Sequence, residues 1–269
     1  MDQPVELLAL AVSVARSASD LAARMRADGV AAVATKSTAT DVVTAADRAV
    51  EQHVRDALRA ARPDDSVLGE EYGAGPEAGR TPARVRWILD PIDGTVNYLY
   101  GLPLYAVSLA AEVDGEVRAG VVINVASGRE WTATRGGGAF CGGTRLRASG
   151  ETALGQALVG TGFGYAAERR RHQAQVVAGL IEQIRDIRRM GAASIDLCLV
   201  AEGSLDAYYE KGLNPWDHAA GGLIAAEAGC LVTGLKGAPA GLEMVVAAPP
   251  ALHGPLHDRL VELDAAGGT

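Results

Sequence analysis

The chain has 269 residues, with 25 basic and 33 acidic side chains and a formal net charge of −8. With 48% hydrophobic and 22% charged residues it has the composition of a globular protein with a sizeable core, which excludes disorder of the whole chain. The acidic balance argues against a nucleic-acid partner. No apolar run reaches the ~18 residues of a membrane span, and the N-terminus lacks a secretory pattern. The three cysteines are widely spaced and do not form a metal motif. We therefore expect a reduced, cytoplasmic protein without a membrane partner.

The first half of the chain predicts helices followed by strands. In chain order the apolar periodicity favours a helix from about residue 5 to Asp28, a helix over 45–61, strands over 66–68 and 85–89, a hairpin over 105–125 and a strand over 129–134. The pair Asp114-Gly115 is a strong hairpin signal. The strand over 85–89 is expected to stop at Asp90, because Pro91 forces the chain out of the sheet.

The second half alternates strands and helices. The predicted elements are strands over 157–160, 187–190, 206–209 and 244–247, and helices over 168–183, over 194–201 and from Asp217. This alternation is typical of helices that cover a sheet. The change of rhythm near residue 150 predicts an N-terminal α+β unit over 1–150 and a C-terminal α/β unit over 151–269.

The most informative segment runs from Trp87 to Thr95. An apolar strand leads into Asp90, and Asp93-Gly94 then turns toward the start of a helix. Two carboxylates three residues apart past a strand end can converge on a hard cation such as Mg²⁺. The main-chain N–H groups at the helix start favour an anion. A solvated turn remains an alternative, because Asp, Pro and Gly are turn formers.

Three other acidic segments have ordinary structural interpretations when each is taken alone. The pair Glu70-Glu71 follows a short strand and is typical of solvated surface. Asp217 precedes an Ala-rich helix and could cap it. The stretch 36–47 resembles a capped helix entry with Asp47 in the first turn. The basic run 169–172 is typical of a solvated helix face.

Taken in order, these segments resemble the inositol monophosphatase family of Mg²⁺-dependent, lithium-sensitive phosphomonoesterases. The match extends over about residues 5–265 and rests on Lys36-Ser37 with Asp41, Thr44 and Asp47, on Gly69-Glu70-Glu71, on the run Asp90 to Thr95, on Gly191-Ala192-Ala193, and on Trp216-Asp217 through Gly221. The resemblance implies a layered αβαβα sandwich of the sugar-phosphatase type, a fold of the α/β (α+β) class. It also implies a homodimer.

The resemblance further implies the metal ligands and the catalytic residues. One Mg²⁺ would be held by Glu70, Asp90 and the main-chain carbonyl of Ile92. Asp90 would bridge to a second ion that Asp93 and Asp217 complete, and a third ion would use Glu70. Two to three ions are therefore expected. Thr95 and Asp47 would orient and deprotonate the attacking water, with Glu70 nearby.

The implied substrate contacts depend on fewer matching positions. They are Asp93, Gly94, Thr95, Arg188, Gly191, Ala193 and Glu210, with the carboxylate of Glu210 accepting hydrogen bonds from ring hydroxyls. Arg188 could equally pair with a surface acid. Lys36 would order a metal loop, or lie exposed at the surface. Ala192 departs from the Ser or Thr that is usual in the family, which leaves the substrate open.

The leading hypothesis is the Mg²⁺-dependent hydrolysis of myo-inositol 1-phosphate, a small-molecule phosphate monoester. Histidinol phosphate, fructose 1,6-bisphosphate and NADP remain alternative substrates for the same site. A binding factor accessory to transcription is an alternative of a different class.

Overall fold

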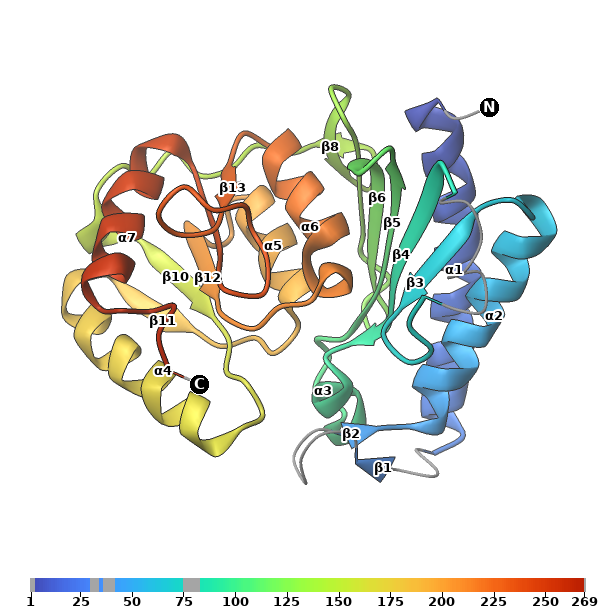
Figure 1. The fold of residues 1–269 in the computed structure, drawn as a ribbon, viewed down its shortest axis with the longest axis horizontal. Coiled ribbons are helices and arrows are strands. Elements are labelled where there is room, and N and C mark those ends of the chain that lie inside the picture. Colours follow the sequence, from blue (N-terminus) through green and yellow to red (C-terminus); the bar gives the residue numbers. More distant parts are fainter. Residues whose placement is uncertain (1–2, 30–33, 36–41, 75–82, 269) are drawn as a thin grey trace.

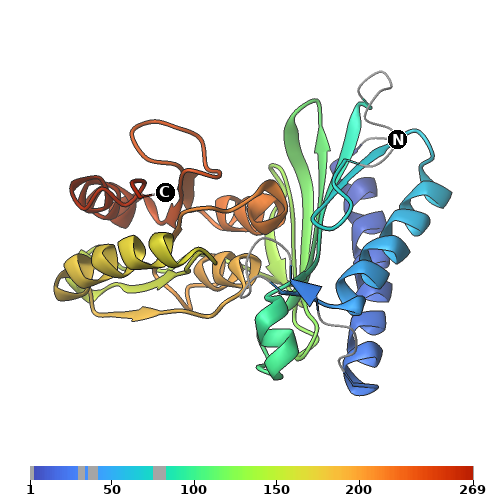
Figure 2. The same cartoon turned by 60° about the horizontal axis from the view of Figure 1, so that its bottom comes forward.

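The computed structural model describes residues 3–29, 34–35, 42–74 and 83–268. It shows two large sheets and three pairs of helices stacked in layers, beside a small two-stranded sheet of β1 and β2 (Figure 1). The outer pairs are α1 (Pro4–Ala27) with α2 (Ala45–Ala61), and α4 (Ala167–Leu180) with α7 (Pro250–Glu262). Between the two sheets lie α5 (Ala193–Ala201) and α6 (Pro215–Glu227). The turned view shows α4 and α7 far from α1 and α2 (Figure 2). The expected αβαβα sandwich is confirmed.

The first sheet has seven strands, and all neighbours are antiparallel except the parallel pair β3 and β4. In spatial order they are β3 (Ser66–Gly69), β4 (Val85–Asp93), β5 (Ala106–Val113), β6 (Glu116–Asn124), β7 (Glu130–Thr134), β8 (Gly138–Cys141) and β9 (Thr144–Arg145). Asp114 and Gly115 join β5 to β6 with φ of 52° and 83°. Two positive φ angles in succession define the tight hairpin turn that this pair predicts.

Strand β4 is longer than expected, because it runs through Pro91 to Asp93. The prediction that the strand ends at Asp90 was wrong. Its neighbour β3 ends opposite Leu89, so beyond that residue β4 has β5 on one side only. The pairing with β5 shifts register between Asp90 and Asp93. A proline fits such an irregular edge, where its missing N–H costs no ladder bond, and the bulge turns both aspartates toward one end of the sheet.

The second sheet has five strands in the order β11-β10-β12-β14-β13. Their bounds are β10 (Leu158–Thr161), β11 (Asp186–Arg188), β12 (Ala207–Glu210), β13 (Leu231–Thr233) and β14 (Val245–Ala248). The remaining short elements are β1 (Ala34–Thr35), β2 (Val42–Val43), α3 (Thr95–Tyr100), η1 (Leu154–Gln156) and η2 (Ile181–Gln183). The sequence did not predict β1, β2, β8, β9, β13 or α7. The first sheet ends at Arg145 and the second starts at Leu158, so the proposed boundary near residue 150 falls between them and stays a prediction.

Alternating residues of each central strand pack on opposite helix layers. In β5, Val107 and Leu109 join the core beneath α1 and α2, whereas Ala106 and Ala110 join the core around α5 and α6. Because side chains of a strand point to opposite faces in turn, each sheet supplies two cores. A third core lies between the second sheet and the pair α4 and α7. No helix in the described parts of the chain could span a bilayer.

Helix α6 packs closely on both α5 and the first sheet. A Cβ built on Gly221 would lie 2.9 Å from Cβ of Leu197 in α5, and one on Gly120 of β6 would lie 3.0 Å from Cα of Ala220. The next glycine of the helix, Gly222, would bring its Cβ only to 3.7 Å from Val232. The middle layer therefore depends on the absence of particular side chains.

We expect Gly221→Ala and Gly222→Ala to change stability in opposite directions. The first forces the contact with Leu197 apart and should lower the free energy of unfolding by about 1–3 kcal/mol. The second adds helix propensity without a clash and should raise it by up to about 1 kcal/mol. Urea unfolding of both variants measures the difference, and equal effects would contradict the close packing of α5 on α6.

Candidate active site

A cavity of about 450 Å³ opens where β4, β12 and the starts of α5 and α6 meet. Its lining contains most of the site residues that the sequence predicted: Glu70, Asp90, Ile92, Asp93, Gly94, Thr95, Gly191, Ala193, Glu210 and Asp217. These residues come from segments that lie far apart in the sequence. The volume is within the ~300–1,000 Å³ typical of small-molecule sites.

The end of β4 supplies two buried aspartates. Asp90 accepts a hydrogen bond from the main-chain N–H of Ile92 at 3.0 Å. The Oδ2 atom of Asp93 accepts from the main-chain N–H of Ser194 at 2.7 Å and from the Ser194 hydroxyl. Gly94 follows with φ of 84°, and a Cβ there would lie 2.9 Å from the Leu104 carbonyl oxygen. Both the backbone angle and the space therefore require glycine at this turn.

Asp47 and Thr95, which the sequence analysis paired as the residues that orient the attacking water, are in hydrogen-bond contact. Asp47 is fully buried in the first turn of α2, where Oδ2 accepts from the Thr44 N–H at 2.8 Å and from the Thr44 hydroxyl at 2.6 Å. Its other oxygen lies 3.1 Å from the Thr95 hydroxyl, which is also 3.1 Å from the Ile92 carbonyl. One hydroxyl proton serves one acceptor at a time, so this threonine can switch between the two.

Asp217 both caps helix α6 and lines the cavity. From the sequence alone these two roles remained alternatives. Asp217 is the third residue of α6, and its Oδ2 accepts from the main-chain N–H of Asn214 at 2.6 Å in a capping box. It also lines the cavity opposite Asp93. The cap fixes the carboxylate without a basic side chain.

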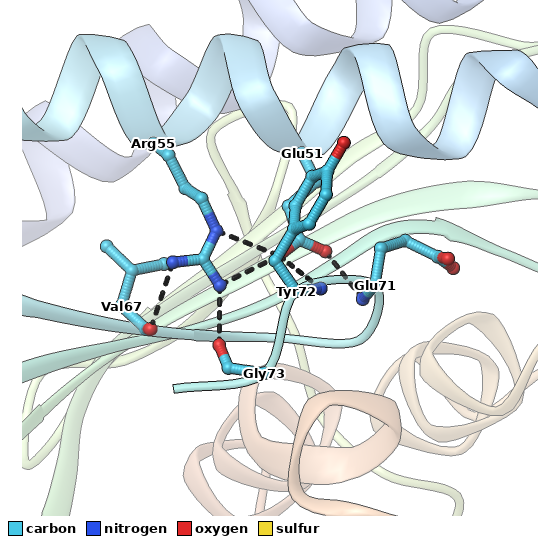
Figure 3. A network of polar contacts seen from close by, with 6 residues as sticks. All are labelled: Glu51, Arg55, Val67, Glu71, Tyr72 and Gly73. Atoms are coloured by element: carbon cyan, nitrogen blue, oxygen red, sulfur yellow. Dashed lines mark hydrogen bonds and ion pairs between the residues drawn. The ribbon is translucent and has the colours of Figure 1, made fainter. Parts of the chain in front are cut away.

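Glu70 lies on the turn that follows β3. A buried ion pair of α2 holds the neighbouring residues of this turn in place (Figure 3). Glu51 and Arg55 of α2 pair at 2.8 Å, and their side chains are only 0% and 8% exposed. Glu51 accepts from the main-chain N–H groups of Glu71 and Tyr72 at 2.8 and 3.2 Å. Arg55 donates to the carbonyls of Val67 and Gly73. The network thus ties both sides of the turn that carries Glu70 to one helix.

Burial and mutual repulsion dominate the electrostatics of the cavity. Burial, followed by the charges of Glu70, Asp93 and Asp217, raises the pKa of Asp90 well above its ordinary value. Burial, followed by Asp93 and Glu70, does the same to the pKa of Asp217. Burial also raises the pKa of Asp93 to about 6, although the bonds from Ser194 and the charge of Arg189 oppose the shift. Carboxylates that disfavour one another's charge in this way would be stabilised by a cation.

The carboxylates do not form a finished metal centre as they stand. Among the described residues, no three His, Cys, Asp or Glu side chains are grouped closely enough to hold an ion. Like charges that repel one another are expected to stay apart until a cation is present. The donor set itself, carboxylates with the Ile92 carbonyl, matches the oxygen ligands that Mg²⁺ prefers.

One predicted residue, Arg188, lies outside the cavity, and another, Lys36, is not among the described residues. Arg188 is the last residue of β11, and its Nη1 donates to Oδ2 of Asp186 at 2.6 Å outside the cavity. Residues two apart in a strand share a face, which explains this pair. The next residue, Arg189, lines the cavity, whereas Arg188 does not. Lys36, with Ser37 and Asp41 of the same motif, lies outside the described residues.

The sequence alone missed Ser194 and the pair Glu51 and Arg55. Ser194 is completely buried and holds Asp93 from the first turn of α5, two residues after the alanine that replaces the usual Ser or Thr. Its position directly after Gly191-Ala192-Ala193 was the available signal. The spacing of Glu51 and Arg55, four residues apart in a helix, could have suggested an ion pair but not its burial.

Glu210 at the end of β12 faces the cavity from the second sheet. The Tyr208 hydroxyl donates to its Oε2. Burial raises its pKa to about 7, against the opposing effects of the Tyr208 bond and the Arg189 charge. A carboxyl group that titrates near neutral pH can accept or donate hydrogen bonds to an alcohol.

This fold is shared with solved structures of the IMPase fold. The structure of Mycobacterium tuberculosis SuhB superposes with a TM-score of 0.84 at 40% identity, over 99% of this chain and 100% of that one. The sequence pattern of the inositol monophosphatase family matches residues 3–264. The chain belongs to the inositol monophosphatase family, whose members are phosphatases.

Two curated relatives differ in the names that they carry. The inositol-1-monophosphatase SuhB of Mycobacterium tuberculosis is 45% identical over 264 residues, covering 92% of this chain and 91% of that protein. The Nus factor SuhB of Pseudomonas aeruginosa is 41% identical over 242 residues, covering 88% of each chain. The family is therefore established, whereas the substrate depends on further argument.

We expect Glu51→Gln to lower the free energy of unfolding by about 3–5 kcal/mol, because Arg55 would keep a buried charge without its partner. The matched control is Glu112→Gln, which breaks a pair with Arg86 whose side chain is 44% exposed, and it should cost less than about 1 kcal/mol. Urea unfolding measures both variants. Similar losses in the two would show that the Glu51 pair is no more than a surface contact.

We expect Glu210→Gln to stabilise the protein in a pH-dependent way. Folding raises the carboxyl pKa from 4.5 to about 7, so the folded state is favoured where the group is protonated, and the penalty grows as pH rises through this range. The variant, which keeps the Tyr208 contact, should gain about 1–3 kcal/mol over the parent between pH 4.5 and 7.5. Urea midpoints in EDTA test this, and a gain that stays constant with pH would contradict the raised pKa.

Proposed function

We propose that the chain is a Mg²⁺-dependent phosphomonoesterase that hydrolyses myo-inositol 1-phosphate to inositol and inorganic phosphate. The observation that carries the proposal is the convergence of Glu70, Asp90, Asp93 and Asp217 on one cavity beside the Asp47–Thr95 pair. These four acids come from three separate segments, β4, the turn after β3 and the start of α6, and have no common structural purpose there. A cationic cofactor gives them one.

Glu70, Asp90, Asp93, Asp217 and the Ile92 carbonyl would hold two to three Mg²⁺ ions. When bound, Mg²⁺ neutralises phosphate oxygens, lowers the pKa of bound water and stabilises a leaving oxygen. The hydrogen bonds from Ser194 and Asn214 orient Asp93 and Asp217 for this task. Outer partners of this kind set ligand orientation in metal sites generally.

The chain's own residues account for the remaining steps. The Thr95 hydroxyl, placed by Asp47, accepts a hydrogen bond from the attacking water while it donates to the carboxylate. The water proton then has a path through Thr95 to Asp47, which acts as general base. The water oxygen bonds to phosphorus as the ester P–O bond breaks. The departing alkoxide takes a proton from solvent water to become the alcohol, and the protonated Asp47 returns its proton to solvent. The main-chain N–H groups of Gly94 and Thr95 bind the phosphate.

The alcohol would lie between Glu210 and the turn of Gly191 and Ala193. Glu210 offers an acceptor that suits ring hydroxyls, and the relatives named inositol-1-monophosphatase at 45% identity support inositol as the alcohol. Histidinol phosphate, fructose 1,6-bisphosphate and NADP remain alternatives because the same phosphate site would serve them. A homodimer, sensitivity to lithium and a cytoplasmic location belong to the same proposal through the family.

A second candidate has one observation in its favour. Relatives from Pseudomonas aeruginosa and Escherichia coli, 41% and 37% identical to this chain, are named Nus factor SuhB. A binding role need not use the cavity at all. The two candidates therefore separate in a variant that keeps its fold and loses the metal site.

We expect phosphate release from inositol 1-phosphate to require Mg²⁺ and to fall by about 100-fold or more in Asp93→Asn, since even outer partners of metal sites cost ~10–100-fold. Asp186→Asn, an exposed strand residue, is the matched control and should retain parent activity. Phosphate release is assayed with Mg²⁺ or EDTA across inositol 1-phosphate, histidinol phosphate, fructose 1,6-bisphosphate and NADP⁺. Phosphate release that persists in EDTA or in Asp93→Asn would overturn the metal mechanism.

A cellular role that persists in a folded, inactive Asp93→Asn variant would favour the binding factor.

A further inference from the structure

Lys211 comes directly after Glu210, the proposed contact to the alcohol, at the end of β12. In this strand Tyr208 lies in the core around α5 and α6 and donates its hydroxyl to Glu210. Tyr209 lies in the other core, between the second sheet and the pair α4 and α7. Because side chains alternate along a strand, Lys211 is expected on the same side as Tyr209, away from the carboxylate of Glu210.

The ammonium group of Lys211 lies in a cradle of three main-chain carbonyls on that side. It donates to the carbonyl of Ala266, to that of Gly267 at 3.0 Å and to that of Gly268 at 2.8 Å. An ammonium group has three N–H donors, so these carbonyls satisfy all of them. Hydrogen bonds from a charged donor are stronger than those between neutral groups. The cradle therefore ties the chain after β12 to the chain after α7.

The segment that supplies the cradle, residues 264–268, is itself held in the fold. Ala265 is 2% exposed and packs in the core between the second sheet and α7. The carbonyl oxygen of Asp264 accepts from Nε2 of His172 in α4 at 2.8 Å and from the main-chain N–H of Gly267 at 2.8 Å. The cradle is therefore a built part of the outer helix layer and can hold Lys211 in a fixed place.

The carboxylate of Glu210 fits closely in the cavity. A Cβ built on Gly162, directly after β10, would lie 1.9 Å from Oε2 of Glu210. The Tyr208 hydroxyl donates to the same oxygen from within β12. In enzyme sites a displacement of about 1 Å can cost on the order of 100-fold in rate. The position of the main chain at the end of β12 therefore matters for any hydrogen bond that Glu210 makes to an alcohol.

We propose that Lys211 is a positioning residue: the 264–268 segment holds Lys211, and Lys211 holds the end of β12 so that Glu210 stays in place to bind the hydroxyls of the alcohol. The inference rests on the proposed phosphatase function and adds to it a part of the chain that lies beyond α7. Lys211 acts through the main chain that it shares with Glu210, because its own donors are occupied by the cradle. The choice between alcohols should therefore depend on Lys211 more than the hydrolysis of the phosphate does.

The test compares inositol 1-phosphate with phenyl phosphate, a monoester whose alcohol has no further hydroxyl for Glu210 to bind. Lys211→Met keeps the aliphatic stem and removes the three bonds. It should lower kcat/KM for inositol 1-phosphate about tenfold more than for phenyl phosphate, mainly through KM, since about tenfold is the worth of one hydrogen bond. Lys236→Met, on an exposed residue of the loop after β13, is the matched control and should keep the parent ratio.

A second variant disturbs the cradle without a change in β12. Gly268 has φ of 73°, and a Cβ there would lie 2.8 Å from Cγ of His172. Gly268→Val should therefore displace the carbonyls and lower the ratio of the two kcat/KM values in the same direction as Lys211→Met. In a Glu210→Ala background neither change should lower the ratio further, because the residue through which both act has been removed.

The outcomes separate this inference from the function on which it rests. Equal losses on both esters in Lys211→Met, or a tenfold loss of the ratio that persists in the Glu210→Ala background, overturns the positioning role and leaves the phosphatase intact. If the parent enzyme hydrolyses phenyl phosphate but not inositol 1-phosphate, the assignment to inositol is overturned and this inference with it. Absence of phosphate release from both esters in the parent enzyme with Mg²⁺ overturns the phosphatase function itself.

Discussion

Three aspartates of the cavity accept hydrogen bonds from main-chain N–H groups and from no basic side chain of the described residues. The amides of Ile92, Ser194 and Asn214 hold Asp90, Asp93 and Asp217 at 3.0, 2.7 and 2.6 Å. An amide fixes a carboxylate in place but leaves nearly all of its negative charge uncompensated. The layers, bulge and helix starts all serve to bring these amides and acids together. Basic side chains in place of these amides would neutralise the negative charge that a cation requires.

Much of this arrangement follows from the sequence, and the failures have physical causes. The period of the apolar residues was sufficient for α1, α2 and the β5–β6 hairpin, because each has one continuous face or a distinctive turn. Pro91 led to the wrong end for strand β4, because a proline interrupts a strand only where a neighbouring strand would bond its N–H. The sequence does not show that β3 stops pairing with β4 before Pro91. Helix α7 carries Pro255 in its interior, so local propensity speaks against an element that tertiary packing supports.

In the candidate site, too, residues within short motifs could be predicted from the sequence, whereas contacts between distant segments could not. The order of the motifs assigned most of the cavity's acids, since each lies in a short distinctive segment. Arg188 and Arg189 could not be distinguished, because adjacent strand residues face opposite sides and the sequence does not say which side holds the cavity. Ser194 and Glu51 act across 101 and about twenty positions of sequence to hold Asp93 and the Glu70 turn. Such contacts exist only once the layers have assembled.

The position of α5 and α6 late in the sequence also affects folding during synthesis. Strands β4 to β9 are sequential neighbours, so the first sheet can pair as it leaves the ribosome, with α1 and α2 already present to cover one face. Its other face, with Ile88, Val122 and Trp131, is covered by α5 and α6, whose last residue is Glu227. At synthesis rates of ~5–20 residues per second that face stays uncovered for on the order of ten seconds. Nascent chains that end between Arg145 and Glu227 therefore expose this apolar face.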